Sequence, residues 1–173
     1  MHNRGMILLL SAAMAAEVGT EVSAYPAGLQ VSLAAARGVT PTGFLIANAG
    51  ANLTLRHDWG EHSDERGGGP GGGIGWRQEV LGHALGGAHG GIRLTARTEL
   101  WYLRVRWEED GEQGRTNTLV LQPTGRVGYA ISAGPACLEL SAALGREINV
   151  MTNGEAVGEG AILLLGGALM FPL

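Results

Sequence analysis

The sequence predicts an all-β fold, an antiparallel up-and-down transmembrane β-barrel of about eight strands. Three observations support this fold class. Apolar and polar residues alternate along much of the chain, the alternating segments are longer than most soluble strands, and the connections alternate between acidic and neutral. A length of 173 residues fits a single domain.

The N-terminus has the pattern of an export signal. A short positive start precedes an apolar stretch at residues 6–10, which is too short to cross a bilayer, since a transmembrane helix needs about 20 residues. An A-x-A cleavage pattern ends at Ala15. We expect a signal peptide at residues 1–15 and an outer-membrane β-barrel domain at residues 16–173. The alternative for the first segment is an ordinary buried helix or strand.

Alternation is clearest from Leu45 to Arg56, where one parity carries leucine and alanine and the other carries asparagine, threonine and arginine. Residues 92–102, 117–131 and 137–144 repeat it. Each strand therefore has one apolar and one polar face. In a soluble barrel the apolar face lies inside, whereas in a membrane barrel it faces lipid. Alternation alone fits both arrangements.

Strand length favours the membrane barrel. The alternating segments run for about 10–16 residues, whereas soluble strands cluster near about 5–6. About ten alternating residues cross the hydrocarbon layer at a tilt. The expected strands are residues 17–25, 28–37, 43–57, 72–82, 91–107, 116–132, 136–149 and 158–171.

The connections predict the orientation. They alternate between neutral turns at 38–42, 82–91 and 133–135 and acidic loops at 58–71, 108–115 and 149–157. An even number of strands that begins in the periplasm places every acidic loop outside and both termini inside.

Two connections affect the strand count and the loop assignment. Tyr25–Gly28 is either a tight turn, which gives eight strands, or a kink in one longer strand, which gives seven. The stretch Gly67–Gly73 contains six glycines and one proline, and we expect it to be a flexible loop that leads into the next strand.

The aromatic residues are expected to form two girdles at the membrane interfaces. Near the periplasmic strand ends lie Phe44, Tyr129 and Phe171. Toward the outer ends lie Tyr25, Trp59, Trp101, Tyr102 and Trp107.

Composition argues against two classes of function. The net charge of −4, from 16 acidic and 12 basic residues, lacks the basic surface that nucleic acid requires, so no nucleic-acid partner is expected. Cys137 is the only cysteine, which excludes an internal disulfide and a cysteine-based zinc cluster. We expect it to be a small packing residue.

Several segments resemble a known group of proteins. They are Trp107 with the acids after it, Val120–Thr124, Glu147–Val150 and Gly154–Ile162. Together they resemble uncharacterised bacterial outer-membrane β-barrel proteins, small barrels of the OmpA or OmpX type. The resemblance implies insertion into the bacterial outer membrane. We expect a monomer whose partners are membrane lipid, lipopolysaccharide and the barrel insertion machinery. It implies no catalytic residues.

Two features depart from that pattern. Small outer-membrane barrels usually end on an aromatic residue, whereas here Phe171 is followed by Pro172 and Leu173. The expected last strand is apolar on both parities from Ala161 to Leu169, so its lumen face is poorly defined.

The charged residues of the polar parity are the main candidate site. They are Arg56, Arg97, Glu99, Arg126 and Glu139. We expect them to form an ion-pair network that fills the lumen, because buried charges must pair and an eight-stranded barrel is just wide enough for side chains. The expected function is structural or surface-interacting, without enzymatic activity. The alternatives are a narrow porin-like channel for small solutes and a soluble lipocalin-like ligand-binding barrel.

A second cluster lies in the first acidic loop and contains His57, Asp58, Glu61, His62 and Asp64. It is a weak candidate for a divalent metal, and a catalytic role beside Ser63 is a further alternative. A solvated loop explains it more simply, so no metal and no cofactor are expected. His83 and His89 are expected to be exposed turn residues.

Overall fold

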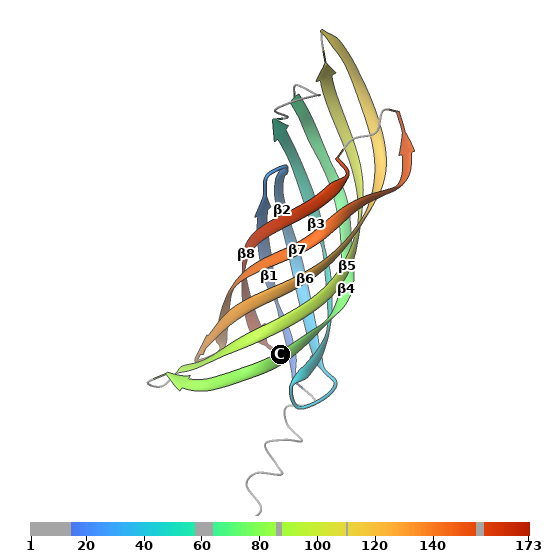
Figure 1. The fold of residues 1–173 in the computed structure, drawn as a ribbon. Coiled ribbons are helices and arrows are strands. Elements are labelled where there is room, and N and C mark those ends of the chain that lie inside the picture. The colour runs from blue at the N-terminus through green and yellow to red at the C-terminus, as the bar shows by residue number, and fades with distance from the viewer. Residues whose placement is uncertain (1–14, 58–63, 86–87, 110, 155–157) are drawn as a thin grey trace, which may run out of the picture.

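The computed structural model describes residues 15–57, 64–85, 88–109, 111–154 and 158–173. They form eight strands: β1 (Ala16–Tyr25), β2 (Gly28–Gly38), β3 (Gly43–His57), β4 (Asp64–Leu85), β5 (Ala88–Glu109), β6 (Glu112–Ala133), β7 (Ala136–Asn153) and β8 (Gly160–Pro172). Each strand pairs antiparallel with the next, and β1 pairs with β8 to close the barrel (Figure 1). The predicted up-and-down barrel is confirmed.

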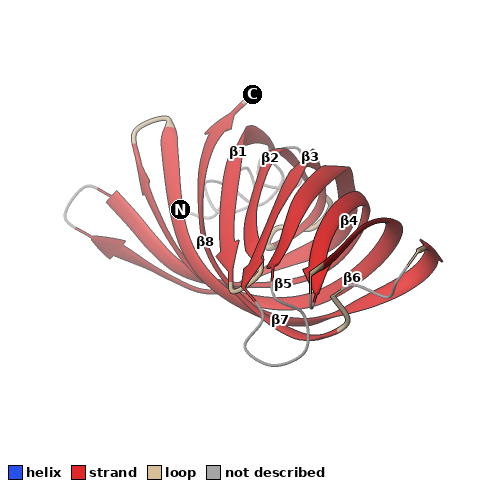
Figure 2. Ribbon diagram, turned by 90° about the horizontal axis from the view of Figure 1, so that it is seen from above, coloured by secondary structure: helices blue, strands red, loops and turns tan. Residues whose placement is uncertain are grey.

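Figure 2 looks down on the molecule and shows the strands curving round one ring. In the described part of the chain, no helix has the length and apolarity needed to cross a membrane.

The strand count is settled by the first turn. Pairing between β1 and β2 continues to Tyr25 opposite Gly28, so only Pro26 and Ala27 lie between the strands. Gly28 has φ of +150°, a conformation that favours glycine. The segment is therefore a tight turn, and the described strands number eight rather than seven.

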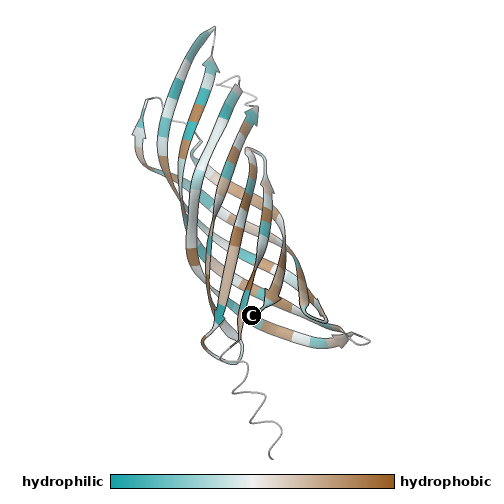
Figure 3. Ribbon diagram, turned by 180° about the vertical axis from the view of Figure 1, so that it is seen from behind, coloured by the Kyte–Doolittle hydropathy of each residue, from teal (hydrophilic) through white to brown (hydrophobic). Residues whose placement is uncertain are grey.

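The barrel has an apolar exterior and a polar interior. Leu33, Leu140 and Leu144 are 65–70% exposed on the outside, whereas Gln30 and Asn52 are buried inside. Figure 3 shows hydrophobic and hydrophilic residues alternating along the strands. This is the arrangement of a transmembrane barrel. It is the reverse of the one that a soluble lipocalin-like barrel requires.

The glycine-rich stretch is part of a strand, so its prediction as a flexible loop is wrong. Residues 67–73 lie within β4, which pairs with both β3 and β5. The inward positions of β4 between Glu65 and Arg77 are all glycine: Gly67, Gly69, Gly71, Gly73 and Gly75. The missing side chains leave lumen space that β5 fills.

Two contacts show how closely β5 uses that space. A Cβ atom on Gly71 would lie 2.4 Å from Cε3 of Trp101, and one on Gly73 would lie 2.7 Å from Cγ of Glu99. Trp101 is fully buried and Glu99 is 1% exposed. The glycines are therefore required by packing across the sheet, and they do not mark a break in the strand.

The strand ends define two rims of the barrel. β1 begins and β8 ends at one rim, which we call the terminal rim, where the strand ends Gly38 and Gly43, Leu85 and Ala88, and Ala133 and Ala136 also lie. The opposite rim, the distal rim, is formed by the strand ends Tyr25 and Gly28, His57 and Asp64, Glu109 and Glu112, and Asn153 and Gly160. The predicted turn at 82–91 is shorter than expected, because β4 and β5 already pair at Leu85 and Ala88. The predicted signal peptide lies almost wholly outside the described residues.

The two expected aromatic girdles are only partly present. Tyr25, Phe44 and Trp101 are buried, with at most 9% exposure, because they share the parity of the inward polar residues. Tyr102, Tyr129 and Phe171 do face outward, and so does Trp76. Trp107 is partly buried against Trp101 and its neighbours. Trp59 lies outside the described residues.

The last strand has a defined lumen face in spite of its apolar sequence. Ile162 and Leu164 are buried and pack with Tyr25, Ala27 and Ala143. The apolar inward residues of β8 therefore form a small core beside the β1–β2 turn.

We predict that Gly71→Val lowers the free energy of unfolding by roughly 1–3 kcal/mol, because the new side chain overlaps Trp101. The measurement is urea unfolding of the barrel in lipid vesicles. Gly125→Val is the matched control, because a Cβ atom at Gly125 meets nothing within 4 Å. Equal unfolding midpoints for the two variants would show that the β4 glycines are not needed for packing.

Candidate functional site: the lumen

The middle of the lumen is crossed by a group of charges that we call the middle group: Glu21, Arg97, Glu99 and Arg126. Glu21 lies on β1 and Arg97 on β5, four strands away in either direction round the ring. Both guanidinium Nη atoms of Arg97 donate to the Glu21 carboxylate, each at 2.8 Å. This bidentate pair therefore spans the barrel from wall to wall.

The other members of the middle group surround that pair. Arg126 forms a second ion pair with Glu21 and donates to Ser23 Oγ at 3.4 Å. Nε of Arg97 lies 3.4 Å from Oε1 of Glu99, which also accepts a hydrogen bond from Asn48 Nδ2 at 2.6 Å. Two carboxylates thus face two guanidinium groups, so the charges of this group balance.

A second group lies toward the terminal rim and is centred on Arg93. Its Nη2 lies 2.9 Å from Glu79 Oε1 and its Nη1 lies 3.2 Å from Glu139 Oε2. Nη1 also donates to Cys137 Sγ at 3.3 Å. Cys137 is buried, as expected of a packing residue, and this contact also gives its sulfur a polar partner.

Arg77 forms another ion pair toward the terminal rim. Its Nη2 donates to Glu17 Oε2 at 2.8 Å, and its guanidinium lies 4.3 Å from the centroid of the Phe44 ring. This explains why Phe44 faces the lumen, where it stacks on a buried cation. We call the residues around Arg93 and Arg77 the terminal group.

A third group, the distal group, lies toward the distal rim. Arg56 pairs with Glu65 at 3.7 Å and with Glu147 at 3.6 Å. Gln122 Nε2 donates to Glu147 at 3.3 Å, and Gln122 Oε1 accepts from Trp101 Nε1 at 3.2 Å.

Further hydrogen bonds complete the distal group. Gln30 Nε2 also donates to Gln122 Oε1, at 2.8 Å. The Tyr25 hydroxyl donates to Asn52 Oδ1 at 2.8 Å. Neutral amides and hydroxyls therefore link the charged residues to the walls in this part of the barrel.

The five residues singled out from the sequence all lie in these groups, but in three places. Arg97, Glu99 and Arg126 belong to the middle group, Glu139 to the terminal group and Arg56 to the distal group. In the described part of the chain, the ion pairs of these residues lie in three groups stacked along the lumen.

Several partners were absent from the predicted set: Glu17, Glu21, Glu65, Arg77, Glu79, Arg93 and Glu147. Each shares the inward parity of its strand, so the signal was present in the sequence. Glu17 and Glu21, for example, lie on one face of β1 with Ser23.

Little free space remains among these groups. A cavity of about 40 Å³ lies between the middle and terminal groups, bounded by Glu21, Arg97, Arg126, Arg77 and Glu139. It has room for only a few water molecules. The middle of this barrel is therefore filled by charged side chains.

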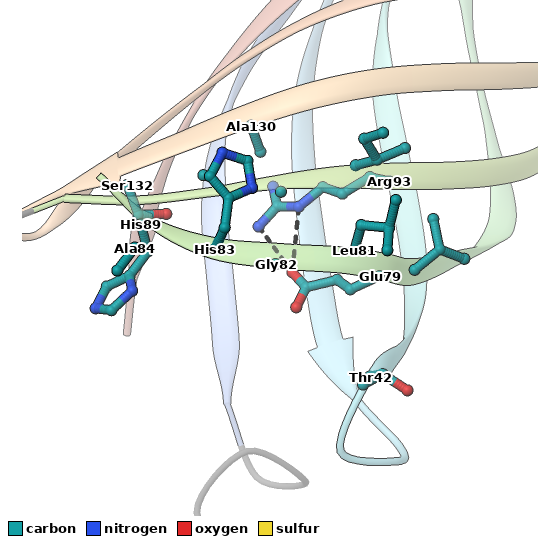
Figure 4. Close-up of a pocket in the computed structure, with 14 residues that line it drawn as sticks. Thr42, Glu79, Leu81, Gly82, His83, Ala84, His89, Arg93, Ala130 and Ser132 are labelled. Carbon is teal, nitrogen blue, oxygen red and sulfur yellow. Dashed lines mark hydrogen bonds and ion pairs between the residues drawn. The ribbon is translucent and has the colours of Figure 1, made fainter.

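A wider hollow of about 550 Å³ opens at the terminal rim, inside the β4–β5 hairpin. Figure 4 shows Arg93 and Glu79 facing each other there, joined by their ion pair. His83 and His89 line the same hollow and are exposed, but they lie in strands and not in a turn. His83 Nε2 lies 3.0 Å from the Tyr129 hydroxyl.

The candidate metal loop cannot be placed in full. Asp58, Glu61 and His62 lie outside the described residues. For His57 and Asp64 the structure describes only the backbone, in which the two residues pair at the ends of β3 and β4. Among the described residues, no group of three or more histidine, cysteine or acidic side chains could hold a metal ion.

Comparison with known proteins identifies the fold. No family model and no curated protein matches the chain. Among solved structures, the N-terminal β-barrel domain of Pseudomonas aeruginosa OprF has a TM-score of 0.53 at 12% identity, covering 92% of this chain and 97% of that one. Neisserial surface protein A (NspA) has a TM-score of 0.54 at 8% identity, covering 91% and 94%. The shared feature is the fold of small outer-membrane β-barrels.

We predict that Arg97→Ala lowers the free energy of unfolding by roughly 3–5 kcal/mol, because it leaves Glu21 and Glu99 short of a buried counter-charge. Urea or thermal unfolding in detergent measures the loss. Arg37→Ala, on an exposed outward position of β2, should change it by less than about 0.5 kcal/mol. A double variant with Glu21→Ala should cost less than the sum of the two single changes. Additive losses would mean that the two side chains are not coupled.

Proposed function

We propose that this chain is an integral protein of the bacterial outer membrane whose lumen is closed by its own side chains and which has a structural or surface-interaction role. The observation that carries the proposal is the bidentate pair between Arg97 and Glu21, which crosses the lumen and is 7% and 6% exposed at its two ends.

The membrane location is supported by the exterior of the barrel. Outward residues such as Leu33, Leu55 and Leu140 are 64–70% exposed and would meet lipid tails. Burying them against hydrocarbon is favourable, whereas leaving them in water would be a strong drive to aggregate. Membrane lipid and lipopolysaccharide are accordingly the proposed partners, and the chain is proposed to act as a monomer that the barrel insertion machinery assembles.

The surface role is supported by unequal strand lengths at the distal rim. β5 and β6 stay paired as far as Glu109 and Glu112, whereas β1 and β2 already turn at Tyr25 and Gly28. The β5–β6 hairpin rises above its neighbours in Figure 1. A hairpin of this kind reaches beyond the membrane and offers its polar end to contacts outside the cell.

A channel and an enzyme are less well supported. Solute passage requires a continuous opening, and the middle group fills the cross-section at Glu21, Arg97 and Arg126. The charged residues that converge there are paired with each other, which suits a structural role better than a catalytic one. We therefore propose no catalytic activity and no cofactor.

The location predicts a specific behaviour on extraction. The protein should remain in the membrane fraction until detergent is added, and the unheated sample should migrate differently from the boiled one on a denaturing gel, because a closed barrel resists detergent unfolding. N-terminal sequencing would test cleavage after Ala15. A product that is soluble without detergent would defeat the membrane assignment.

The closed lumen predicts the electrical behaviour. In planar bilayers, the inserted wild-type protein should give no discrete conductance steps, because the ion pairs of the middle group block the path. Gel mobility of the protein sample used for the bilayers, with and without heating, confirms separately that the barrel is folded. Reproducible steps from inserted protein would favour the narrow channel for small solutes over a closed barrel.

A further inference from the structure

We propose that four arginines on the outer wall near the distal rim, Arg66, Arg104, Arg106 and Arg115, form a binding site for the phosphate groups of an outer-leaflet lipid headgroup. The proposal rests on the membrane location proposed above. It adds a specific site on β4, β5 and β6.

The arginines occupy adjacent rows across the strands. Arg66 pairs with Arg106, which pairs with Arg115, so three cations stand side by side in one row. Arg104 lies in the next row toward the membrane, opposite Gly68 and Asn117. Like charges directly opposite each other in a sheet repel, and an anion bound between the guanidinium groups would reduce that repulsion.

The row lies where the apolar belt ends. One row further toward the membrane than Arg104, Tyr102 pairs with Leu119, and both are on the outer wall. The guanidinium of Arg104 lies 5.7 Å from the centroid of the Tyr102 ring. Along the strand, the aromatic residue comes first and the arginines follow. This order matches that of a bilayer, in which the acyl chains end and the phosphate groups begin.

The wall is hollowed at the same place. A groove of about 660 Å³ is lined by all four arginines, by Tyr102 and by Gly68. Gly68 has φ of +145°, and a Cβ atom there would lie 2.2 Å from Asn52 O, so a side chain is excluded on two grounds. The volume suits a phosphorylated sugar headgroup.

Acidic residues occupy the next row, on the side away from the membrane. Beyond the arginines, away from the membrane, Glu108 pairs with Gln113 and accepts a hydrogen bond from it at 3.2 Å. Asp64 lies opposite Glu108 in the same row, so the arginines stand between these acidic positions and the membrane. Guanidinium forks bind phosphate oxygens in pairs, which makes arginine well suited to this ligand.

The test is native mass spectrometry of the full chain in detergent, titrated with bisphosphorylated lipid A and with its dephosphorylated form. The wild-type protein should bind the phosphorylated lipid at least about tenfold more tightly. The variant R66Q/R106Q/R115Q should lose that preference. R37Q/R146Q, which removes two exposed outward arginines elsewhere, should keep it.

Several results would overturn the proposal. Equal binding of the two lipids by the wild-type protein would do so without any variant, and so would an unchanged preference in the triple variant. Competition by free pyrophosphate at equal concentration would identify the ligand as a soluble anion and not a lipid. Gel mobility of each sample reports barrel formation, so failure of the membrane proposal would be seen separately from failure of the site.

Discussion

A bidentate ion pair between Arg97 and Glu21 joins β5 and β1, two strands that lie on opposite sides of the barrel and are not neighbours in the sheet. Burying either charge alone would be costly, and each strand supplies the counter-charge for the other. Arg126 and Glu99 balance the pair, and the terminal and distal groups repeat the same solution above and below it. The polar interior is therefore tolerated because nearly every charge in it has an opposite neighbour from another strand.

That arrangement depends on space, and β4 provides it. Its inward positions between Glu65 and Arg77 carry no side chains, which allows Trp101 and Glu99 of β5 to extend into the lumen. A barrel of this size cannot hold large residues on every wall. The large inward side chains of β5 thus occupy the space that the glycines of β4 leave. On its outer face, β4 still presents apolar side chains to lipid, at Ile74 and Trp76.

Alternation of period two predicted which residues share a face of each strand, and strand length together with the acidic connections predicted that the apolar face meets lipid. From Leu45 to Arg56 every outward and inward residue is as expected. The glycine-rich part of β4 was missed because its reason lies on β5 and not in the local sequence. The ion-pair partners were missed for a related reason, since Arg97 meets Glu21 across the ring, and pairing of neighbouring strands does not reveal such contacts.

The glycine face of β4 also affects how the strand finds its alignment. A one-residue slip normally exchanges the two faces of a strand and is strongly penalised, but a glycine-rich segment has little to exchange. The alignment of β4 must then be decided at its ends, where Glu65 meets Arg56 and where Arg77 meets Glu17 and Phe44. The contacts of Glu65 and Arg77 therefore determine the register of the glycine-rich part of β4 that lies between them.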